Sequence, residues 1–225
     1  PRLSEAGELL LGLDYQLSRL LQQQASTTQC LTERTTVQQV VHLLPEQSKL
    51  FIGNSLSIRL FEQFSGTLPQ SCRVFANRGA SGIDGLLATA VGVASAGDIV
   101  TLCVLGDTSL LHDLNSLSLL SSIASPLIVI VLNNDGGGIF HHLPVPDPQI
   151  LRDYYQMPHG YDFSKAAAMF NIAYEAPETL EQLAEILRRA ISLKAPLLIE
   201  IKTSAEDSFA ESQNMPHWLK TITGQ

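Results

Sequence analysis

The start of the chain has apolar positions in a helical rhythm. Leucines recur three or four residues apart, with polar residues between them, at Leu9, Leu10, Leu13, Leu17, Leu20 and Leu21. This spacing predicts an amphipathic helix, and the polar residues 22–28 predict a break after it. From about residue 34 onward, short apolar runs alternate with amphipathic stretches, which is the pattern of strands joined by helices.

Six strands are expected in this alternating region, at residues 49–53, 72–76, 99–105, 126–132, 172–175 and 196–202. Helices are expected before and between them, at residues 35–44, 55–64, 82–96, 115–123, 162–170 and 179–192. The strand PLIVIVL (126–132) shows no polar alternation, which is typical of parallel strands covered by helices on both faces. We therefore predict a doubly wound, mostly parallel six-stranded α/β domain.

The predicted domain occupies residues 34–203. Before it we expect an N-terminal helix and linker from a preceding domain over residues 1–33. After it we expect a polar and loosely packed C-terminal tail over residues 204–225, because that stretch has few apolar positions.

The amino-acid composition favours a folded domain and argues against nucleic-acid binding and membrane insertion. The chain has 225 residues with 45% hydrophobic and 16% charged residues, against about 25% charged residues in an average domain, so a well-buried core is expected. The net charge of −8 and the lack of a Lys/Arg run argue against nucleic-acid binding. The most apolar stretch, residues 117–132, is interrupted by serines and a proline, which argues against membrane insertion.

Cysteine usage favours a reducing compartment. Cys30, Cys72 and Cys103 are far apart and odd in number, so a disulfide framework is not expected. No signal peptide is visible at the start of the sequence. We therefore expect a cytoplasmic protein.

Polar and glycine-rich residues follow four of the predicted strands. In open α/β sheets ligands bind beyond the carboxyl ends of strands, so these exits are the candidate site. Asn54 and Ser55 follow the first strand and suit a helix N-cap, a phosphate contact, or both. The loop RGASGIDG (78–85) is either an ordinary glycine-rich turn or a close backbone approach to a ligand.

The other two exits are informative as a pair. Taken alone, Asp107 suits a helix N-cap and Asn133-Asn134 suits an ordinary turn. The residues between them, 108–132, have room for one helix and one strand, so the two loops are expected at neighbouring strand ends. Asp107, Asn134 and a carbonyl near Gly136 could then bind one Mg²⁺ through oxygen atoms, with a substrate diphosphate completing the shell.

This arrangement resembles the thiamine-diphosphate motif of the decarboxylase and acetohydroxyacid synthase superfamily. Four segments are similar to the C-terminal domain of one branch, the carboligases of menaquinone biosynthesis (MenD enzymes): GNSLSIRL (53–60), NRGASGIDGLLATAVG (77–92), GDTSLLHDLNSLSLL (106–120) and NNDGGGIFHHLP (133–144). The resemblance covers most of the chain and is strongest over residues 50–145. The superfamily motif often reads Gly-Asp-Gly, whereas its third position here is Thr108.

The resemblance implies a transferase with thiamine diphosphate and Mg²⁺, or Mn²⁺, as cofactors. Such an enzyme decarboxylates 2-oxoglutarate and adds the succinyl-semialdehyde carbanion to isochorismate. In the family a glutamate from a different domain, on a partner subunit, activates the cofactor's pyrimidine. We therefore expect a part of a longer homodimeric or homotetrameric enzyme without its N-terminal pyrimidine-binding domain, which the start at Pro1 also suggests. Such a part is expected to be inactive, or nearly so, alone.

The resemblance also implies individual roles. The expected metal ligands are Asp107, Asn134 and the Gly136 carbonyl. The cofactor site is expected to comprise these three with Asn54, Ser55, Gly106, Ser109, Gly137 and Ile139. Ile83 matches the apolar residue that holds the cofactor bent, and from the residues alone it is equally a core isoleucine. The expected substrate contacts are Arg59 and Arg78, which are otherwise surface ion-pair residues, with Phe140 and Leu143 on the apolar side.

Two alternatives stay open at this level. One is another 2-oxoacid decarboxylase or acetohydroxyacid synthase-type enzyme. The other is a non-catalytic domain that binds phosphate or a protein partner, since no pyrimidine-activating glutamate can be assigned in this chain. The histidines at 112, 141, 142 and 159 fit no recognised metal-ligand spacing, and we expect them to be solvent-facing loop residues.

Overall fold

A computed structural model describes residues 4–27, 30–214 and 220. Its centre is one parallel sheet with the strand order β2-β1-β3-β4-β6-β5. The strands are β1 (Lys49–Ile52), β2 (Arg73–Phe75), β3 (Thr101–Gly106), β4 (Leu127–Asn133), β5 (Ala173–Glu175) and β6 (Leu197–Lys202). The predicted doubly wound α/β fold is confirmed, and every strand pair is parallel.

The central strands are buried on both faces because each alternates between two cores. In β3, Leu102 and Val104 contribute to one apolar cluster, whereas Cys103 and Leu105 contribute to the other. All seven residues of β4 are buried. This two-sided burial explains why the strand sequences show no polar alternation.

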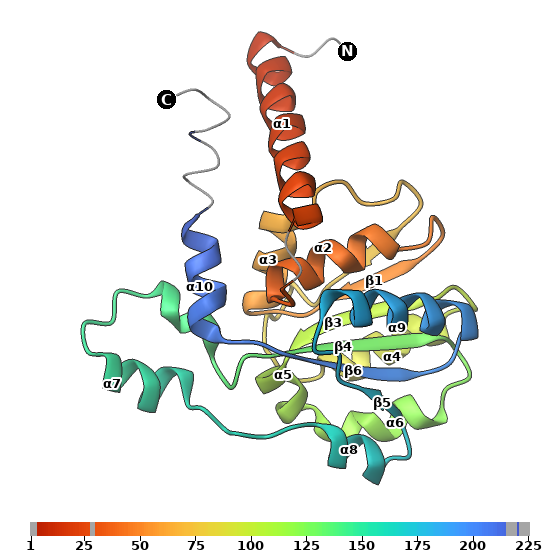
Figure 1. The fold of residues 1–225 in the computed structure, drawn as a ribbon. Coiled ribbons are helices and arrows are strands. Elements are labelled where there is room, and N and C mark those ends of the chain that lie inside the picture. Colours follow the sequence, from red (N-terminus) through yellow and green to blue (C-terminus); the bar gives the residue numbers. More distant parts are fainter. Residues whose placement is uncertain (1–3, 28–29, 215–219, 221–225) are drawn as a thin grey trace.

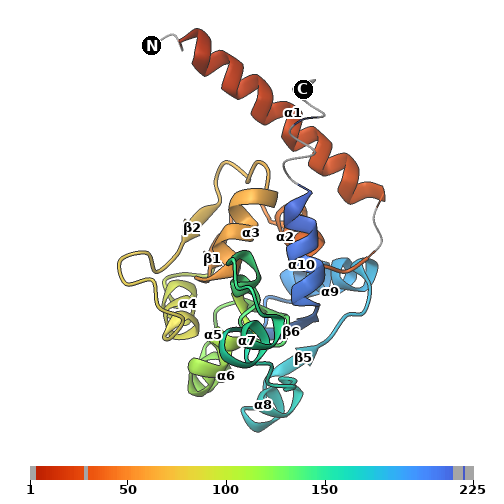
Figure 2. The same cartoon turned by 90° about the vertical axis from the view of Figure 1, so that its left-hand side faces the viewer.

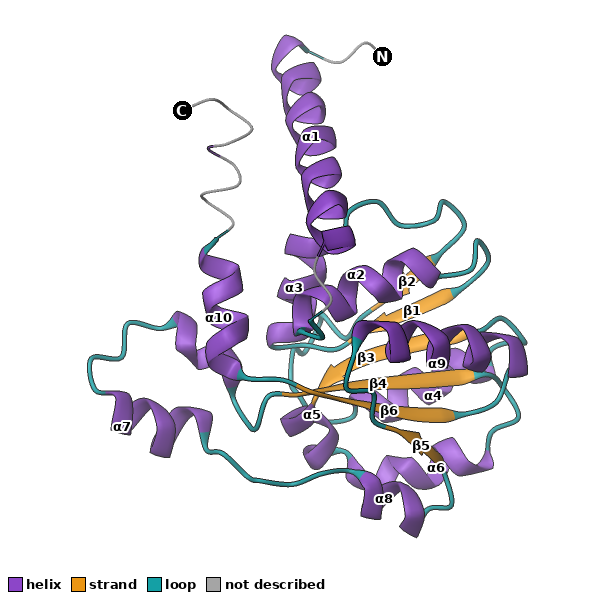
Figure 3. Ribbon diagram, viewed as in Figure 1, coloured by secondary structure: helices purple, strands orange, loops and turns teal. Residues whose placement is uncertain are grey.

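Helices cover both faces of the sheet (Figure 3). One face carries α2 (Glu33–Leu43), α3 (Leu56–Phe64) and α9 (Leu180–Leu193). The other face carries α4 (Leu86–Ser95), α5 (Asp107–His112), α6 (Leu117–Ser122) and α8 (Ser164–Met169). Each helix turns its apolar residues toward the sheet, as Leu183 and Leu187 of α9 do.

The first helix is longer than predicted. Helix α1 (Glu5–Thr27) continues through the expected break at residues 22–28 as far as Thr27. Glutamine and alanine are good helix formers, so the polar stretch QQQA does not stop it. The helix projects away from the sheet domain in both views (Figures 1 and 2).

The stretch expected to be a loose tail instead begins with a packed helix. Helix α10 (Ala205–Gln213) buries Ser208, and its Glu211 pairs with Arg34 of α2 at 3.1 Å. Together with the short helix α7 (Pro148–Ile150), it lies beyond one end of the sheet, and Figure 2 views that end. The expected division of the chain at residues 33/34 and 203/204 stays a prediction.

Several segments, α5 among them, are helical where no helix was predicted. Residues Gly138–His142 form a 3-10 helix, and Leu151–Gln156 form a π-helix after α7. Within the described part of the chain, every helix is too short or too polar to be a membrane-spanning segment.

A buried carboxylate joins the second half of the sheet to its neighbours. Glu200 in β6 is fully buried and accepts hydrogen bonds from Asn133 Nδ2 (2.6 Å), Phe163 N (2.9 Å) and Tyr174 OH (2.5 Å). Burial, followed by the bond to Glu200, raises the pKa of the Tyr174 phenol. Strand β5, the end of β4 and the start of α8 are thereby tied to one side chain.

Replacing Glu200 should therefore destabilise the domain. In Glu200→Gln an amide NH₂ faces groups that are themselves donors, so we expect a loss of about 2 kcal/mol and a fall in Tm of roughly 5 °C. Thermal unfolding followed by circular dichroism measures the change. Glu185→Gln, on the exposed side of α9, is the matched control. Equal Tm values for the two variants would contradict the assigned role.

Candidate functional site

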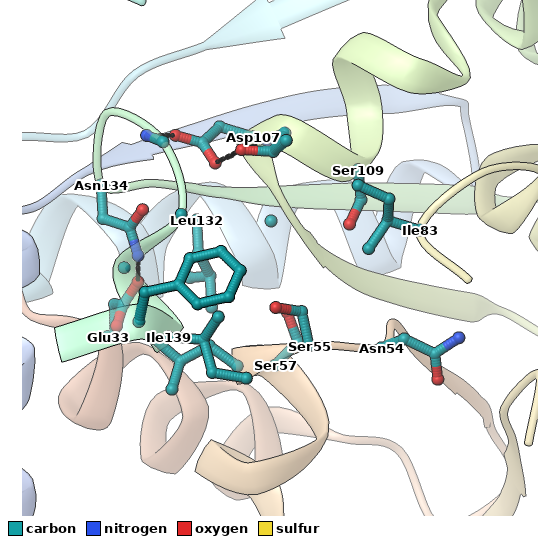
Figure 4. Close-up of a pocket in the computed structure, with 17 residues that line it drawn as sticks. Glu33, Asn54, Ser55, Ser57, Ile83, Asp107, Ser109, Leu132, Asn134 and Ile139 are labelled. Atoms are coloured by element: carbon teal, nitrogen blue, oxygen red, sulfur yellow. Dashed lines mark hydrogen bonds between the residues drawn. The ribbon is translucent and has the colours of Figure 1, made fainter. Parts of the chain in front are cut away.

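A pocket opens beyond the carboxyl ends of β1, β3 and β4 (Figure 4). The chain leaves β1 toward β2 on one side and later returns to β3 on the other, so the pocket lies at the point where the strand order reverses. Most of the residues expected in the site line it: Asn54, Ser55, Ile83, Gly106, Asp107, Ser109, Asn134, Gly136, Gly137, Ile139 and Phe140. The lining also includes residues that the sequence did not single out, namely Glu33, Leu56, Ser57, Thr108, Leu132 and Gly138.

Asp107 is held at the end of β3 by donors from three segments. Its Oδ1 accepts from Thr108 N at 2.6 Å, and its Oδ2 accepts from Gly136 N at 2.8 Å and from His159 Nε2 at 3.1 Å. The side chain is 2% exposed. Burial raises the pKa of this carboxyl, against the lowering effect of the Gly136 and Thr108 amides and of His159.

His159 corrects one expectation from the sequence. The prediction that it faces solvent is wrong, because its side chain is only 10% exposed and contacts Asp107. Tyr161 N donates to His159 Nδ1 at 2.9 Å, so the neutral ring carries its proton on Nε2 and donates to the carboxylate. The contact between His159 and Asp107 could not be predicted from a spacing in the sequence, because the two residues are 52 positions apart.

Asn134 brings an oxygen atom without a partner to the same pocket. Its side-chain nitrogen donates to Glu33 Oε1 at 2.8 Å, whereas its Oδ1 is buried with no hydrogen-bond partner among the described residues. A buried unpaired oxygen costs free energy unless a ligand satisfies it. Such an atom beside the Asp107 carboxylate fits a bound cation.

The glycines after Asn134 allow this close packing. A Cβ on Gly138 would lie 2.5 Å from Asn134 Nδ2, and a Cβ on Gly136 would lie 2.2 Å from Gln156 O. Gly136 also has a φ of +120°, which side-chain-bearing residues rarely adopt. The glycines therefore let the loop pack closely against Asn134 and Gln156. An ordinary turn would not require glycine at all three positions.

Glu33 is the one acidic residue among the pocket residues that the sequence analysis did not select. It is the first residue of α2, directly after the N-cap Thr32, and it is 1% exposed. Burial, with a contribution from the charge of Asp107, raises its pKa to about 7, while the hydrogen bonds from Ser208 and Asn134 act in the opposite direction. A glutamate at a helix start ordinarily stabilises the helix dipole, so its place in the sequence does not mark it as a site residue.

Ser55 has a backbone conformation that helix capping does not explain. It is the N-cap residue of α3, but its hydroxyl makes no capping hydrogen bond. Its φ of 63° and ψ of −125° lie in a region that costs about 1–3 kcal/mol for a non-glycine residue. The hydroxyl and the start of α3 face the pocket, which is the geometry of an anion site at a helix N-terminus.

Asn54 and Arg78 are engaged with each other. Asn54 Nδ2 donates to Asn77 O at 3.1 Å and to Gly82 O at 2.6 Å, and its Oδ1 accepts from Arg78 Nη1 at 2.9 Å. The Asn54 side chain therefore fastens the glycine-rich loop to the end of β1. Arg78 itself is exposed and lies outside the lining of the pocket.

Two other expected residues lie outside the main pocket. Arg59 is exposed and lines an adjoining hollow that shares Leu56 and Ile139 with the pocket, and its Nη1 donates to Ser55 O at 2.6 Å. Leu143 is 48% exposed and lines neither cavity. The structure thus brings the metal and diphosphate candidates together in the pocket with Phe140, whereas the substrate candidates Arg59, Arg78 and Leu143 lie outside its lining.

The donor set fits a hard cation with a diphosphate. Within the described ranges no group of three His, Cys, Asp or Glu residues could hold a metal ion by itself. One carboxylate, one unpaired amide oxygen and backbone carbonyls suit Mg²⁺, which takes oxygen ligands and shares them with substrate phosphates.

Comparisons with known proteins agree with this geometry. Residues 62–201 match the family described as "Thiamine pyrophosphate enzyme, C-terminal TPP binding domain" (thiamine pyrophosphate and thiamine diphosphate are the same compound). A 2-succinyl-5-enolpyruvyl-6-hydroxy-3-cyclohexene-1-carboxylate synthase of Shewanella sediminis is 40% identical over 98% of this chain and 39% of that protein. The synthase of the same name from Photobacterium profundum is 51% identical over 79% of this chain and 30% of that protein.

A solved structure shares the fold. It is described as a putative thiamin diphosphate-dependent enzyme from Mycobacterium smegmatis, with a TM-score of 0.60, 22% identity, and coverage of 77% of this chain and 32% of that one. The chain thus spans less than two fifths of the curated relatives that it matches. Because the family match covers more than half of the sequence, the chain belongs to the family of C-terminal, cofactor-binding domains of thiamine pyrophosphate enzymes.

Proposed function

We propose that the chain is the C-terminal cofactor-binding part of a cytoplasmic carboligase of menaquinone biosynthesis. The complete enzyme would release CO₂ from 2-oxoglutarate and transfer the remaining four-carbon unit to isochorismate. The observation that carries the proposal is the unpaired Asn134 oxygen beside Asp107 in the pocket of this family's domain. The curated relatives at 40% and 51% identity support the choice of reaction.

The proposed cation site uses Asp107, the Asn134 Oδ1 and the Gly136 carbonyl, with Mg²⁺ or Mn²⁺ as the ion. Thiamine diphosphate, when bound, supplies the nucleophilic carbon and the electron sink for decarboxylation. The Ser55 and Ser109 hydroxyls and the backbone around Gly106 and Gly137 would hold its diphosphate. Hydroxyl and amide donors at helix starts and in glycine loops are the usual partners of phosphate oxygens.

The apolar lining would position the cofactor's rings. Ile83 is half-buried and lines the pocket from the glycine-rich loop, on the side opposite to Asn134 (Figure 4). A bulky apolar side chain there would support the rings of thiamine diphosphate and keep them in a defined position. Ile139 and Phe140 close the pocket with apolar surface, which excludes water and strengthens the polar contacts inside.

Arg59 and Arg78 are the proposed partners of substrate carboxylates. Both guanidinium groups are exposed near the pocket, and each uses one nitrogen for a structural bond, to Ser55 O and Asn54 Oδ1 respectively. The other N–H groups of each guanidinium can bind a substrate carboxylate through two parallel hydrogen bonds. Leu143, at the exposed end of the 3-10 helix, would contact substrate only in the complete enzyme.

The remainder of the active site is proposed to come from a second domain. By analogy with the family that the chain resembles, the pyrimidine-activating glutamate would come from an N-terminal domain of a partner subunit, within a homodimer or homotetramer. This chain aligns with 39% of the Shewanella sediminis relative, which leaves room for such a domain in the complete enzyme. Binding and activity are therefore best measured on the complete enzyme that contains this chain.

Replacing Asp107 should abolish metal-dependent cofactor binding. In Asp107→Ala we expect the affinity for thiamine diphosphate in the presence of Mg²⁺ to fall about 100-fold or more. Loss of a residue that only hydrogen-bonds to a metal ligand already lowers metal affinity about 10- to 100-fold, and Asp107 is proposed to be a ligand itself. Calorimetric titration measures the affinity. Asp98→Ala changes an exposed acid before β3 and is the matched control. Unchanged affinity in Asp107→Ala would contradict the proposed cation site.

The two arginines should determine the use of a dicarboxylic substrate. In Arg59→Gln and Arg78→Gln we expect the KM for 2-oxoglutarate to rise about tenfold or more, because hydrogen bonds between charged groups contribute about 1.5–3 kcal/mol. Steady-state kinetics measures the change, with Arg188→Gln on the exposed side of α9 as the control. A wild-type KM for 2-oxoglutarate in both variants would contradict the role of the two arginines, whereas a wild-type enzyme without activity on 2-oxoglutarate would reject this reaction in favour of another 2-oxoacid.

A further inference from the structure

Glu33 is a buried acid next to the proposed cation site, without a role in the function described so far. Its Oε1 accepts from Asn134 Nδ2 at 2.8 Å, and its Oε2 contacts the hydroxyl of Ser208 on α10. The capping box of Thr32 and Thr35 fixes the start of α2, and thereby the position of Glu33. The carboxylate therefore reaches the pocket from a rigid element.

The contact determines which way the Asn134 amide faces. A carboxylate oxygen can only accept a hydrogen bond, so it pairs with the NH₂ group and repels the amide oxygen. This orientation of the Asn134 amide is the same whether Glu33 is ionised or protonated. A proton on Oε2 would still leave Oε1 free to accept the hydrogen bond from Asn134. The amide oxygen consequently lies on the side away from Glu33, inside the pocket (Figure 4).

Apart from Glu33, the groups around Asn134 do not favour one orientation of its side-chain amide over the other. Its Oδ1 has no hydrogen-bond partner within the described part of the chain, so nothing on that side selects oxygen over nitrogen. Gly138 provides the space beside the amide but no polar side chain. The Glu33 acceptor is thus the group that distinguishes the two ends of the amide.

We propose that Glu33 is a positioning residue that turns the Asn134 oxygen toward the divalent cation of the thiamine diphosphate complex. The inference rests on the proposed function, because it requires a cation between Asp107 and Asn134. Glu33 does not itself touch the cation in this assignment. Without its acceptor, the amide is free to present NH₂ to the ion, and a positive ion binds poorly to a donor group.

The test measures metal affinity, with Mn²⁺ as the probe. Free Mn²⁺ is counted by electron paramagnetic resonance during titration of the complete enzyme at saturating thiamine diphosphate. In Glu33→Met, which keeps the bulk but lacks a carboxylate, we expect Mn²⁺ to bind about 10- to 100-fold more weakly. Ser208→Ala removes the other partner of Glu33, and we expect its Mn²⁺ affinity to stay within about threefold of the wild type.

A swapped pair gives the decisive comparison. The double variant Glu33→Gln/Asn134→Asp keeps the net charge and exchanges donor for acceptor, so an oxygen of the new carboxylate again faces the cation. We expect it to bind Mn²⁺ more tightly than either Glu33→Met or the single variant Asn134→Asp, in which two acids face each other. Thermal unfolding of each variant separates loss of affinity from loss of folding, and the swapped pair decides the question if Glu33→Met does not fold.

The outcomes separate this inference from the proposed function. Wild-type Mn²⁺ affinity in Glu33→Met, with affinity lost in Asp107→Ala, would overturn the role of Glu33 and leave the cation site intact. A swapped pair as weak as Asp107→Ala would also overturn it. Equal losses in Ser208→Ala and Glu33→Met would mean that Glu33 only anchors α10. Unchanged Mn²⁺ binding in Asp107→Ala would instead reject the cation site itself.

Discussion

The parallel arrangement of β1, β3 and β4 is the constraint on which the site depends. Parallel strands in register end at one edge of the sheet, and the pairs Ile52–Val104 and Leu132–Gly106 bring three exits to the same level. Gly53 permits the close approach, since a Cβ there would lie 3.0 Å from Leu105 Cβ. The residues after these strands then surround one pocket, whatever their separation in sequence.

The same edge concentrates buried negative charge, which requires compensation. Asp107 and Glu33 are both nearly inaccessible to solvent, and burial raises the pKa of each. Backbone amides, the His159 ring, the Asn134 amide and the Ser208 hydroxyl supply donors to them. The proposed divalent cation would add positive charge at this edge and so balance the two carboxylates further.

Much of the fold followed from patterns that act over short distances. The runs KLFIG and PLIVIVL and the amphipathic stretches between strands predicted the sheet and most of its covering helices, because burial on two faces requires continuous apolar sequence. The polar end of α1 and helix α10 were missed because their apolar pattern is weak, and α10 is held partly by polar contacts such as Arg34–Glu211. Such contacts leave no periodic signal in the chain.

The strand ends could be predicted from the apolar pattern alone, and with them the expectation that Asp107, Asn134 and the glycines after Asn134 share a pocket. Asp107 and Asn134 each follow a buried strand directly, and the glycines begin two residues after Asn134, so the positions of all of them follow from the sheet. Three contacts at the site depend on the fold of the whole chain: Glu33 with the Asn134 amide, His159 with the Asp107 carboxylate, and Ser208 with the Glu33 carboxylate, over separations of 101, 52 and 175 residues along the chain. The physical reason is that these three side chains reach the site through packing of one element on another, and no local spacing encodes that packing.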